Sequence, residues 1–168
     1  MKLLLFALAC AMILASPYDP KNHQNGHELD VSIYEDVNTV FVVMWYSSEA
    51  EDEVVTYNNR NSTDISSKLT GKDDVSFSTI DMSIPGHNDV ENEDEDYSFL
   101  FEKINGKPYS EYETAINEEG PIVNVLRKQK GVRVSGKGIG DEVVDQVEEM
   151  KASIAKDCLL YTSPSPRD

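Results

Sequence analysis

The chain has almost no cysteine. Of its 168 residues only Cys10 and Cys158 are cysteines, and each lies close to one end. Residues 11–157 therefore contain no thiol. A disulfide framework is excluded from this stretch, and so is redox chemistry that needs a pair of thiols.

Basic residues are also scarce. The sequence has 15 Lys and Arg against 31 Asp and Glu, a formal net charge of −16. A field of this sign repels nucleic acid and anionic membrane surfaces, and it attracts cations and basic proteins. We therefore predict no nucleic-acid partner and expect the partner to be a polypeptide or a basic protein. The sequence does not indicate an oligomeric state.

Long apolar runs are missing except at the N-terminus. Lys2 is followed by an apolar run over residues 3–14, which is too short to span a bilayer comfortably, and Ala15 then supplies a small residue. This pattern predicts a secretory signal peptide over residues 1–15 and no membrane insertion. The expected location is the secretory pathway, in the lumen of the endoplasmic reticulum or outside the cell. Residues 16–27 are polar and turn-rich, which predicts a flexible lead-in.

The C-terminal residues 158–168, CLLYTSPSPRD, read like the translation of a sequencing-library adapter. We interpret this tail as non-native. Residues 28–157 remain, and their number is sufficient for one domain with its own core.

The apolar pattern of the first half predicts alternating strands and helices. Residues 28–38 have apolar side chains at alternate positions and predict a short strand, whereas the unbroken apolar run at 40–46 is typical of a central strand covered on both faces. Residues 49–69 predict a helix that NNRNST kinks or breaks, and 75–81 alternate as a strand. The acidic residues 85–96 predict a solvated loop, and 97–104 a short helix.

The second half predicts a hairpin followed by a helix. One helical turn is expected at 110–116, and strands at 122–126 and 132–135 pair antiparallel around the turn KQKG. Asp141 is expected to cap a helix that runs to about residue 156, with one apolar stripe. The order of elements predicts an α/β sandwich, a central mixed sheet with helices on both faces.

Three stretches carry a resemblance to a known fold. They are VVMWYSSEAEDE at 42–53, VSFSTIDMS at 75–83, and GPIVNVLRKQKGVRVSGKGIGDEVVDQVEEM at 120–150. With them, residues 28–156 resemble the thioredoxin fold as protein disulfide isomerases use it. The resemblance places Pro121 where the family carries its cis-proline. It implies a peptide groove beside Gly120 and Pro121, where an extended polypeptide adds as a strand.

The same resemblance marks the place where the family's chemistry is missing. When Trp45 is aligned with the family's aromatic residue, Glu49, Ala50, Glu51 and Asp52 stand in place of the Cys-x-x-Cys loop. Disulfide exchange needs a thiolate and a resolving thiol, and carboxylates can replace neither. These acids suit the start of a helix instead. We therefore predict a degenerate active-site loop, no catalytic residue and no enzyme activity.

Three functions remain open from the sequence. The first is a redox-inactive thioredoxin-like domain that binds polypeptide, as a chaperone-like or interaction module. The second is an acidic protein of the calsequestrin type that binds calcium weakly; no other cofactor is expected. The third is the N-terminal fragment of a longer disulfide isomerase whose catalytic domain is missing here.

Two local motifs complete the sequence-based predictions. The acidic residues at 89–96 lack the alternating ligands and central glycine of an EF-hand, so no metal-ligand set is assigned. Asn61, in the sequon Asn-Ser-Thr, is a candidate for glycosylation.

Overall fold

A computed structural model of the chain describes residues 23, 25–85, 87, 97–128 and 130–162, without the side chains of residues 154–162. The predicted signal peptide, most of the predicted lead-in and most of the acidic run at 85–96 lie outside the described residues. So does the end of the C-terminal tail. The predictions for these segments stay predictions.

Four strands form one mixed sheet in the order β2-β1-β3-β4. These strands are β1 (Val40–Tyr46), β2 (Val75–Asp81), β3 (Ile122–Arg127) and β4 (Lys130–Ser135). β1 pairs parallel with β2 and antiparallel with β3, and β3 and β4 form an antiparallel hairpin. The four strands predicted at these places are confirmed, and β4 begins two residues earlier than expected.

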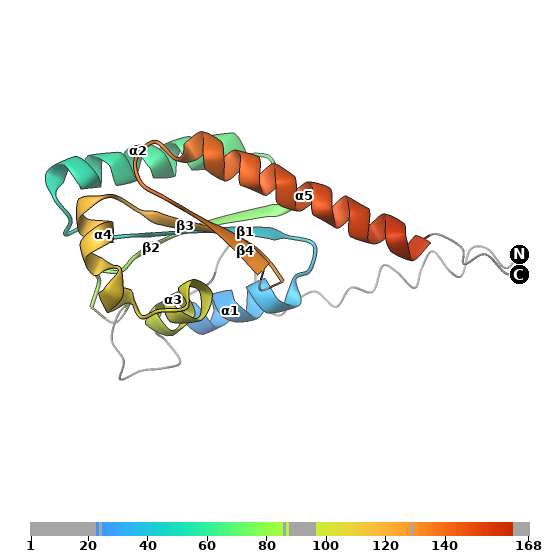
Figure 1. The fold of residues 1–168 in the computed structure, drawn as a ribbon, viewed down its shortest axis with the longest axis horizontal. Coiled ribbons are helices and arrows are strands. Elements are labelled where there is room, and N and C mark those ends of the chain that lie inside the picture. Colours follow the sequence, from blue (N-terminus) through green and yellow to red (C-terminus); the bar gives the residue numbers. More distant parts are fainter. Residues whose placement is uncertain (1–22, 24, 86, 88–96, 129, 163–168) are drawn as a thin grey trace, which may run out of the picture.

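Helices cover both faces of this sheet (Figure 1). α1 (Gly26–Glu35) and α3 (Tyr97–Asn105) lie on one face, and α2 (Asp52–Leu69) and α5 (Gly140–Thr162) lie on the other. A 3-10 turn, η1 (Tyr109–Glu111), and the short helix α4 (Glu113–Glu118) lead from α3 to β3. The predicted α/β sandwich with a central mixed sheet is therefore confirmed. Its element order is the thioredoxin-like one from β1 onward, a parallel β-α-β unit followed by a hairpin and a final helix.

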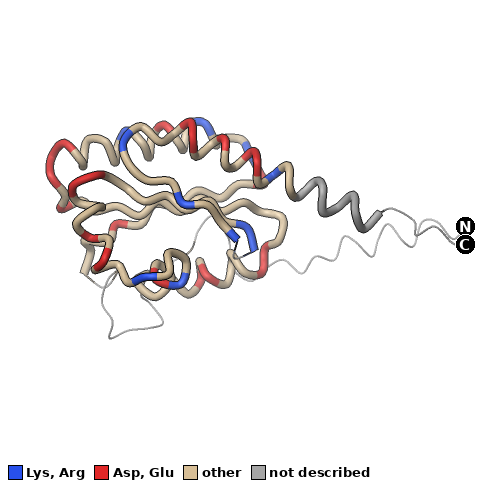
Figure 2. Tube along the Cα trace, in the orientation of Figure 1, with Lys and Arg blue, Asp and Glu red and all other residues tan. Residues whose placement is uncertain are grey.

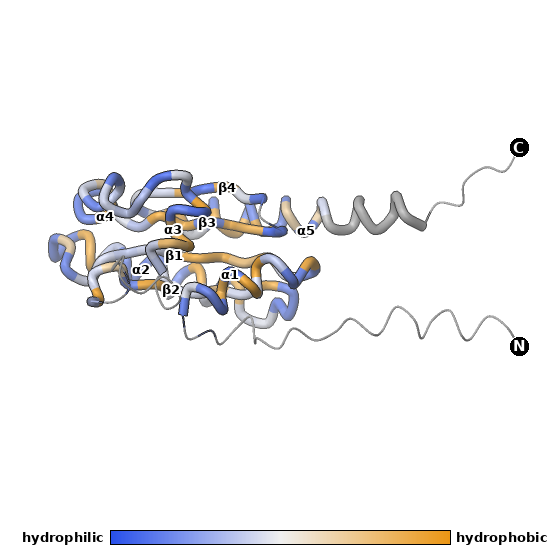
Figure 3. Tube along the Cα trace, turned by 90° about the horizontal axis from the view of Figure 1, so that it is seen from below, coloured by the Kyte–Doolittle hydropathy of each residue, from blue (hydrophilic) through white to orange (hydrophobic). Residues whose placement is uncertain are grey.

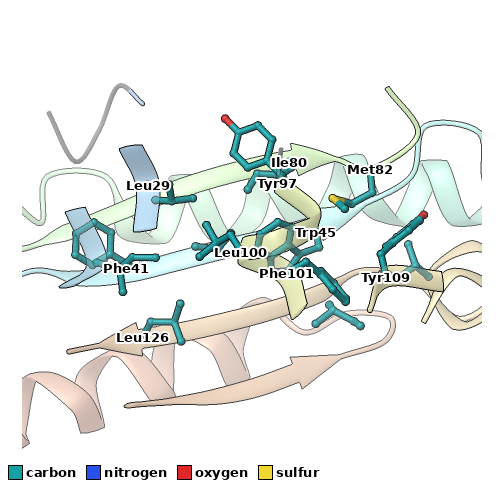
Figure 4. Packing of buried hydrophobic residues seen from close by; sticks show 14 residues of the cluster. Leu29, Phe41, Trp45, Ile80, Met82, Tyr97, Leu100, Phe101, Tyr109 and Leu126 are labelled. Carbon is teal, nitrogen blue, oxygen red and sulfur yellow. The ribbon is translucent and has the colours of Figure 1, made fainter. Parts of the chain in front are cut away.

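The central strand β1 divides the core into two clusters. Its side chains alternate between the two faces, so Phe41, Val43 and Trp45 pack beneath α1 and α3, whereas Val40 and Val42 pack beneath α2 and α5. Both sets are buried, which explains the unbroken apolar run in the sequence. Figure 3 shows β1 and β3 largely in the colour of hydrophobic residues at the centre of the sheet, and Figure 4 shows the cluster beneath α1 and α3.

The segment predicted as a first strand is the helix α1, so that prediction is wrong. Asn25 caps the helix, because its Oδ1 accepts a hydrogen bond of 2.9 Å from the backbone N–H of Glu28. Leu29 and Ile33 are four residues apart and both are buried, as neighbours on one helix face, while Val31 between them is only half-buried. The helix begins at Gly26, two residues before the stretch that was predicted as a strand.

The predicted break in the second helix is also absent. α2 runs without interruption through NNRNST, because two of these asparagines continue its buried face. Asn58 and Asn61 are each 2% exposed and follow Val54 at helical spacing. Their Nδ2 groups donate hydrogen bonds of 3.4 Å to the backbone oxygens of Ser47 and Gly136, whereas Asn58 Oδ1 is buried without a hydrogen-bond partner.

The last helix differs from prediction in its first turn. α5 begins at Gly140, so Asp141 lies inside the first turn and does not cap it. The Asp141 carboxylate instead accepts a hydrogen bond of 2.7 Å from Lys68 Nζ and so ties α5 to α2. The helix continues to Thr162, beyond the expected end at residue 156.

Candidate functional site

The candidate site is the loop between β1 and α2, residues 47–51, at the carboxyl ends of the two parallel strands. Tyr46 ends β1 and is paired with Asp81, which ends β2, so the chain leaves the sheet at two adjacent points. In open α/β sheets, ligands bind beyond the carboxyl ends of the strands. The helix α2 begins directly after this loop at Asp52. The fold therefore places residues 49–52 between the carboxyl end of β1 and the first turn of α2.

Asp81 fixes the shape of this loop. Its Oδ1 accepts hydrogen bonds from the backbone N–H of Ser48 at 3.1 Å, and from the N–H and the hydroxyl of Ser83 at 3.0 and 2.6 Å. The hydroxyls of Ser48 and Ser83 are 2.9 Å apart and share a further hydrogen bond. Within the loop, the N–H of Glu49 donates to Ser47 Oγ at 3.2 Å. One buried carboxylate thus joins the loops that follow β1 and β2.

The hydrogen bonds also set the charge state of Asp81. Burial alone would raise the pKa of this carboxyl group, but the hydrogen bonds from Ser48 and Ser83 together outweigh burial and hold the pKa below its ordinary value. The carboxylate is therefore ionised at neutral pH. Its negative charge, in turn, contributes to the raised pKa of Tyr46, whose main cause is burial.

Asp81→Asn is expected to destabilise the protein by roughly 1–2 kcal/mol at pH 7, because a neutral amide oxygen accepts these bonds more weakly than a carboxylate. The ionised group stabilises the folded state fully above its unfolded pKa of about 3.9, and this contribution is lost as the pH falls through the lower folded pKa. Urea unfolding at pH 7 and pH 3 would measure the difference from the unsubstituted chain, which should shrink at pH 3. A gap equally wide at both pH values would contradict this assignment, and the exposed Asp73→Asn serves as the control.

The surface of the site is acidic. Glu49, Glu51 and Asp52 are exposed at the start of α2, where negative charge is favourable, although Glu51 makes no side-chain cap bond. Figure 2 shows acidic residues around this end of the molecule. The pKa of Tyr109 is raised to about 12. Burial is the main cause, and the negative charges of Glu113, Asp81 and Glu49 add to it.

Trp45 was predicted as part of the degenerate loop, but it belongs to the core. Its side chain is 0% exposed, and its Nε1–H donates a hydrogen bond of 2.7 Å to Oδ1 of the buried Asn124 on β3. Asn124 Nδ2 in turn donates to Asn105 Oδ1 at 3.1 Å. The Trp45 side chain therefore holds β1 in the core, and because it is fully buried it does not contact a ligand at the surface.

Gly120 and Pro121 lie beside the loop, as predicted, but their peptide bond is trans. Trp45 is paired with Ile122, so the register brings Pro121 next to the end of β1. The described residues include no cis peptide bond, and the prediction of a cis-proline is wrong. Gly120 has a φ of +121°, a conformation that side chains rarely adopt, and a Cβ there would lie 3.3 Å from the backbone oxygen of Gly136.

The backbone groups of Gly120 and Pro121 that were expected to pair with an added polypeptide strand form hydrogen bonds within the fold instead. The N–H of Gly120 bonds to Ala115 O at 3.3 Å, and the carbonyl oxygen of Pro121 accepts from Gly136 N at 3.3 Å. These two groups are therefore already engaged within the fold. Of the residues predicted for the site, Glu49, Glu51 and Asp52 remain as exposed side chains at this end.

The glycosylation candidate is not accessible. Asn61 is buried in the middle of α2, and its Nδ2 is bonded to the backbone of the β4–α5 connection. A glycan acceptor needs an exposed amide nitrogen, so the folded structure argues against Asn61.

The sequence analysis missed the residues that hold the site together. Asp81, Ser83 and Tyr109 come from β2 and from the connection before β3, far from the loop in sequence. The available signal for Asp81 was its position, as the last residue of a strand parallel to β1. Within the described part of the chain, no group of three or more His, Cys, Asp or Glu could hold a metal ion. None of its helices is long and apolar enough to cross a membrane.

Comparisons with known proteins add a fold-level likeness. No protein-family profile matches the chain, and no curated protein matches it. Among solved structures, it is similar to chloroplastic thioredoxin z, with a TM-score of 0.46 and 14% identity over 76% of this chain and 91% of the other. At this level of similarity we draw no conclusion from the likeness and transfer no functional residue from it.

Proposed function

We propose that this chain is a redox-inactive thioredoxin-like interaction domain that binds a basic segment of another polypeptide at residues 49–52. The observation that carries the proposal is the loop itself, in which three exposed carboxylates stand on a backbone held by Asp81. A surface that is already ordered loses less conformational entropy on binding. Its charge selects basic partners and speeds their association.

The proposal excludes disulfide exchange by this domain. The loop residues offer only carboxylates, hydroxyls and backbone groups, and none of these can form a mixed disulfide. The N-terminal apolar run supports action in the secretory pathway, either in the endoplasmic reticulum or outside the cell. Calcium binding by the acidic run at 85–96 remains the prediction made from the sequence, because most of that run lies outside the described residues.

The test is the binding of a fluorescent eight-residue peptide of alternating Lys and Val, measured by anisotropy at low salt. We expect Glu49→Gln, Glu51→Gln and Asp52→Asn together to weaken binding roughly tenfold, since each exposed ion pair contributes up to about 1 kcal/mol. Added salt should weaken the binding to the unsubstituted chain. The same preparation should leave the disulfides of insulin intact.

A matched variant separates the site from overall charge. Asp73→Asn, Glu142→Gln and Asp145→Asn remove the same number of exposed acids elsewhere, and Glu142 lies in the first turn of α5 as Asp52 lies in that of α2. This variant should bind almost as well as the unsubstituted chain. Equal losses in the two variants would show a diffuse attraction with no site at residues 49–52.

A further inference from the structure

The outer edge of β4 is free. β4 is the last strand in the sheet, and in the part of the chain that the structure describes no other strand pairs with it. Five of its six residues are exposed, and Val134 is the exception. An exposed edge strand presents unpaired backbone groups to solvent and is a template for another strand.

The register identifies the free backbone groups. In an antiparallel ladder, hydrogen-bonded pairs alternate with pairs that are not hydrogen-bonded. The bond from Gly136 N to Pro121 O fixes this alternation, so Val134 and Val132 are bonded to β3. Gly131, Arg133 and Ser135 therefore direct their N–H and C=O groups away from the sheet.

A groove lies on each side of this edge. Toward α1 and α3, a cavity of about 520 Å³ has an apolar floor that includes Ile33, Leu100 and Leu126. Toward α5, a second cavity of about 780 Å³ includes Val132 and Met150. Successive side chains of an extended segment point to opposite faces, so a strand added to β4 would place them alternately in the two grooves.

The two grooves hold a concentration of positive charge in an acidic protein. Five of the chain's 15 Lys and Arg line them, whereas only Asp30 and Glu149 contribute acids; the five are Lys103, Arg127, Lys128, Lys130 and Arg133. Figure 2 shows the basic residues of the β3–β4 hairpin, at the end of the sheet opposite the acidic loop.

Two of these cations have no acid to neutralise them. Lys128 and Lys130 form no ion pair with any described residue. Arg133 is held over the ring of Tyr112, 5.3 Å from its centre, and donates a hydrogen bond of 2.7 Å to the Tyr112 hydroxyl. The edge therefore combines a positioned guanidinium with two available ammonium groups.

We propose that the edge of β4 binds an acidic, extended polypeptide segment by strand addition. Backbone hydrogen bonds to Gly131, Arg133 and Ser135 would give the alignment, and carboxylates beside Lys128 and Lys130, in the groove toward α5, would give the selectivity. This surface, its partner and its location differ from those of the basic-segment site at residues 49–52. The two proposals therefore stand or fall separately.

A second copy of this chain fits the edge less well. Antiparallel pairing of two β4 strands would bring Arg133 of one copy near Arg133 of the other, since it lies close to the middle of the strand. The two copies would also each carry a net charge of −16. Both effects are repulsive, whereas an acidic segment brings no cation next to Arg133 and meets more basic than acidic side chains in the two grooves.

The experiment titrates the full chain with a fluorescent eight-residue peptide of alternating Glu and Val, and records amide hydrogen exchange by NMR. We expect binding, together with protection of the Gly131, Arg133 and Ser135 amides. The same peptide with every second backbone nitrogen methylated should bind at least about tenfold more weakly, because it loses strand hydrogen bonds. Equal binding of the methylated peptide would overturn strand addition.

Charge variants complete the test. Lys128→Gln with Lys130→Gln should weaken binding of the Glu/Val peptide roughly three- to tenfold at low salt, the range expected for two exposed ion pairs. Lys107→Gln with Lys137→Gln, which removes two exposed cations elsewhere, should have little effect. Equal weakening by the two variants would overturn the site. Protection of the three amides without peptide, with dimers in sedimentation equilibrium, would assign the edge to a second copy instead.

Discussion

Replacing Phe101 by alanine is expected to lower the free energy of unfolding by about 3–5 kcal/mol, the range for truncating a buried aromatic side chain. Phe101 is 0% exposed, and it makes edge-to-face contacts with the rings of Trp45, Tyr109 and Tyr112, at centroid distances of 5.2, 5.7 and 5.4 Å. Figure 4 shows Phe101 between Trp45 and Tyr109. The cavity would lie beneath the site, because Trp45 is the last but one residue of β1, the strand that leads into the loop.

Phe99, two residues earlier in α3, provides the matched control. It is 50% exposed, and its ring lies 5.8 Å from Lys103 Nζ. Phe99→Ala should therefore cost less than about 1 kcal/mol. Urea unfolding followed by circular dichroism measures both variants. If Phe101→Ala does not fold, Phe101→Leu gives a smaller, measurable loss, and equal losses for positions 99 and 101 would contradict the described packing.

Asn124→Leu is expected to cost about 2–3 kcal/mol, because it leaves the Trp45 Nε1–H buried without an acceptor. The shape of the core changes little, since leucine is close to asparagine in size. Urea unfolding again gives the free energy, and the fluorescence of Trp45, the single tryptophan of the chain, should report the altered environment.

A double-mutant cycle tests whether the loss comes from this bond. Trp45→Phe removes the donor, so adding Asn124→Leu to it should cost less than Asn124→Leu alone, with a coupling of about 1–2 kcal/mol. Additive losses would mean that the Trp45–Asn124 bond contributes nothing specific. In that case the buried amide would serve Asn105 alone.

The sequence predicted the sheet better than the helices that cover it. The strands β1, β2 and β3 were visible because burial on one or both faces leaves a pattern that has few alternatives. The apolar residues at 29, 31 and 33 are compatible with two structures. Their alternation fits a strand, but positions 29 and 33 are also an i, i+4 pair on one face of a helix. The structure forms the helix, with Asn25 as its N-cap and a hydrogen bond from Glu28 N to the Asn25 side chain. The sequence signal for this cap is an Asn followed three residues later by a Glu.

The long helix α2 shows a different limit. Asn58 and Asn61 are polar by composition, yet they occupy buried positions because backbone oxygens of distant segments, Ser47 and Gly136, lie opposite them. No local pattern contains this information. The isomer of the Gly120–Pro121 bond is likewise set by the surrounding fold, and the sequence motif alone predicted the wrong one.

The hydrogen bonds of Asp81 allow the exposed residues of the loop to be substituted without loss of its backbone conformation. Asp81 holds the loop by accepting a hydrogen bond from the backbone N–H of Ser48, and this bond does not involve the exposed side chains at positions 49, 51 and 52. The backbone conformation of the loop therefore does not depend on which side chains stand at positions 49, 51 and 52. Glu49→Cys with Asp52→Cys would place two thiols at the start of α2, where the helix dipole favours a thiolate. Two substitutions would thus convert the acidic loop into a Cys-x-x-Cys sequence without changing the residues that hold its backbone.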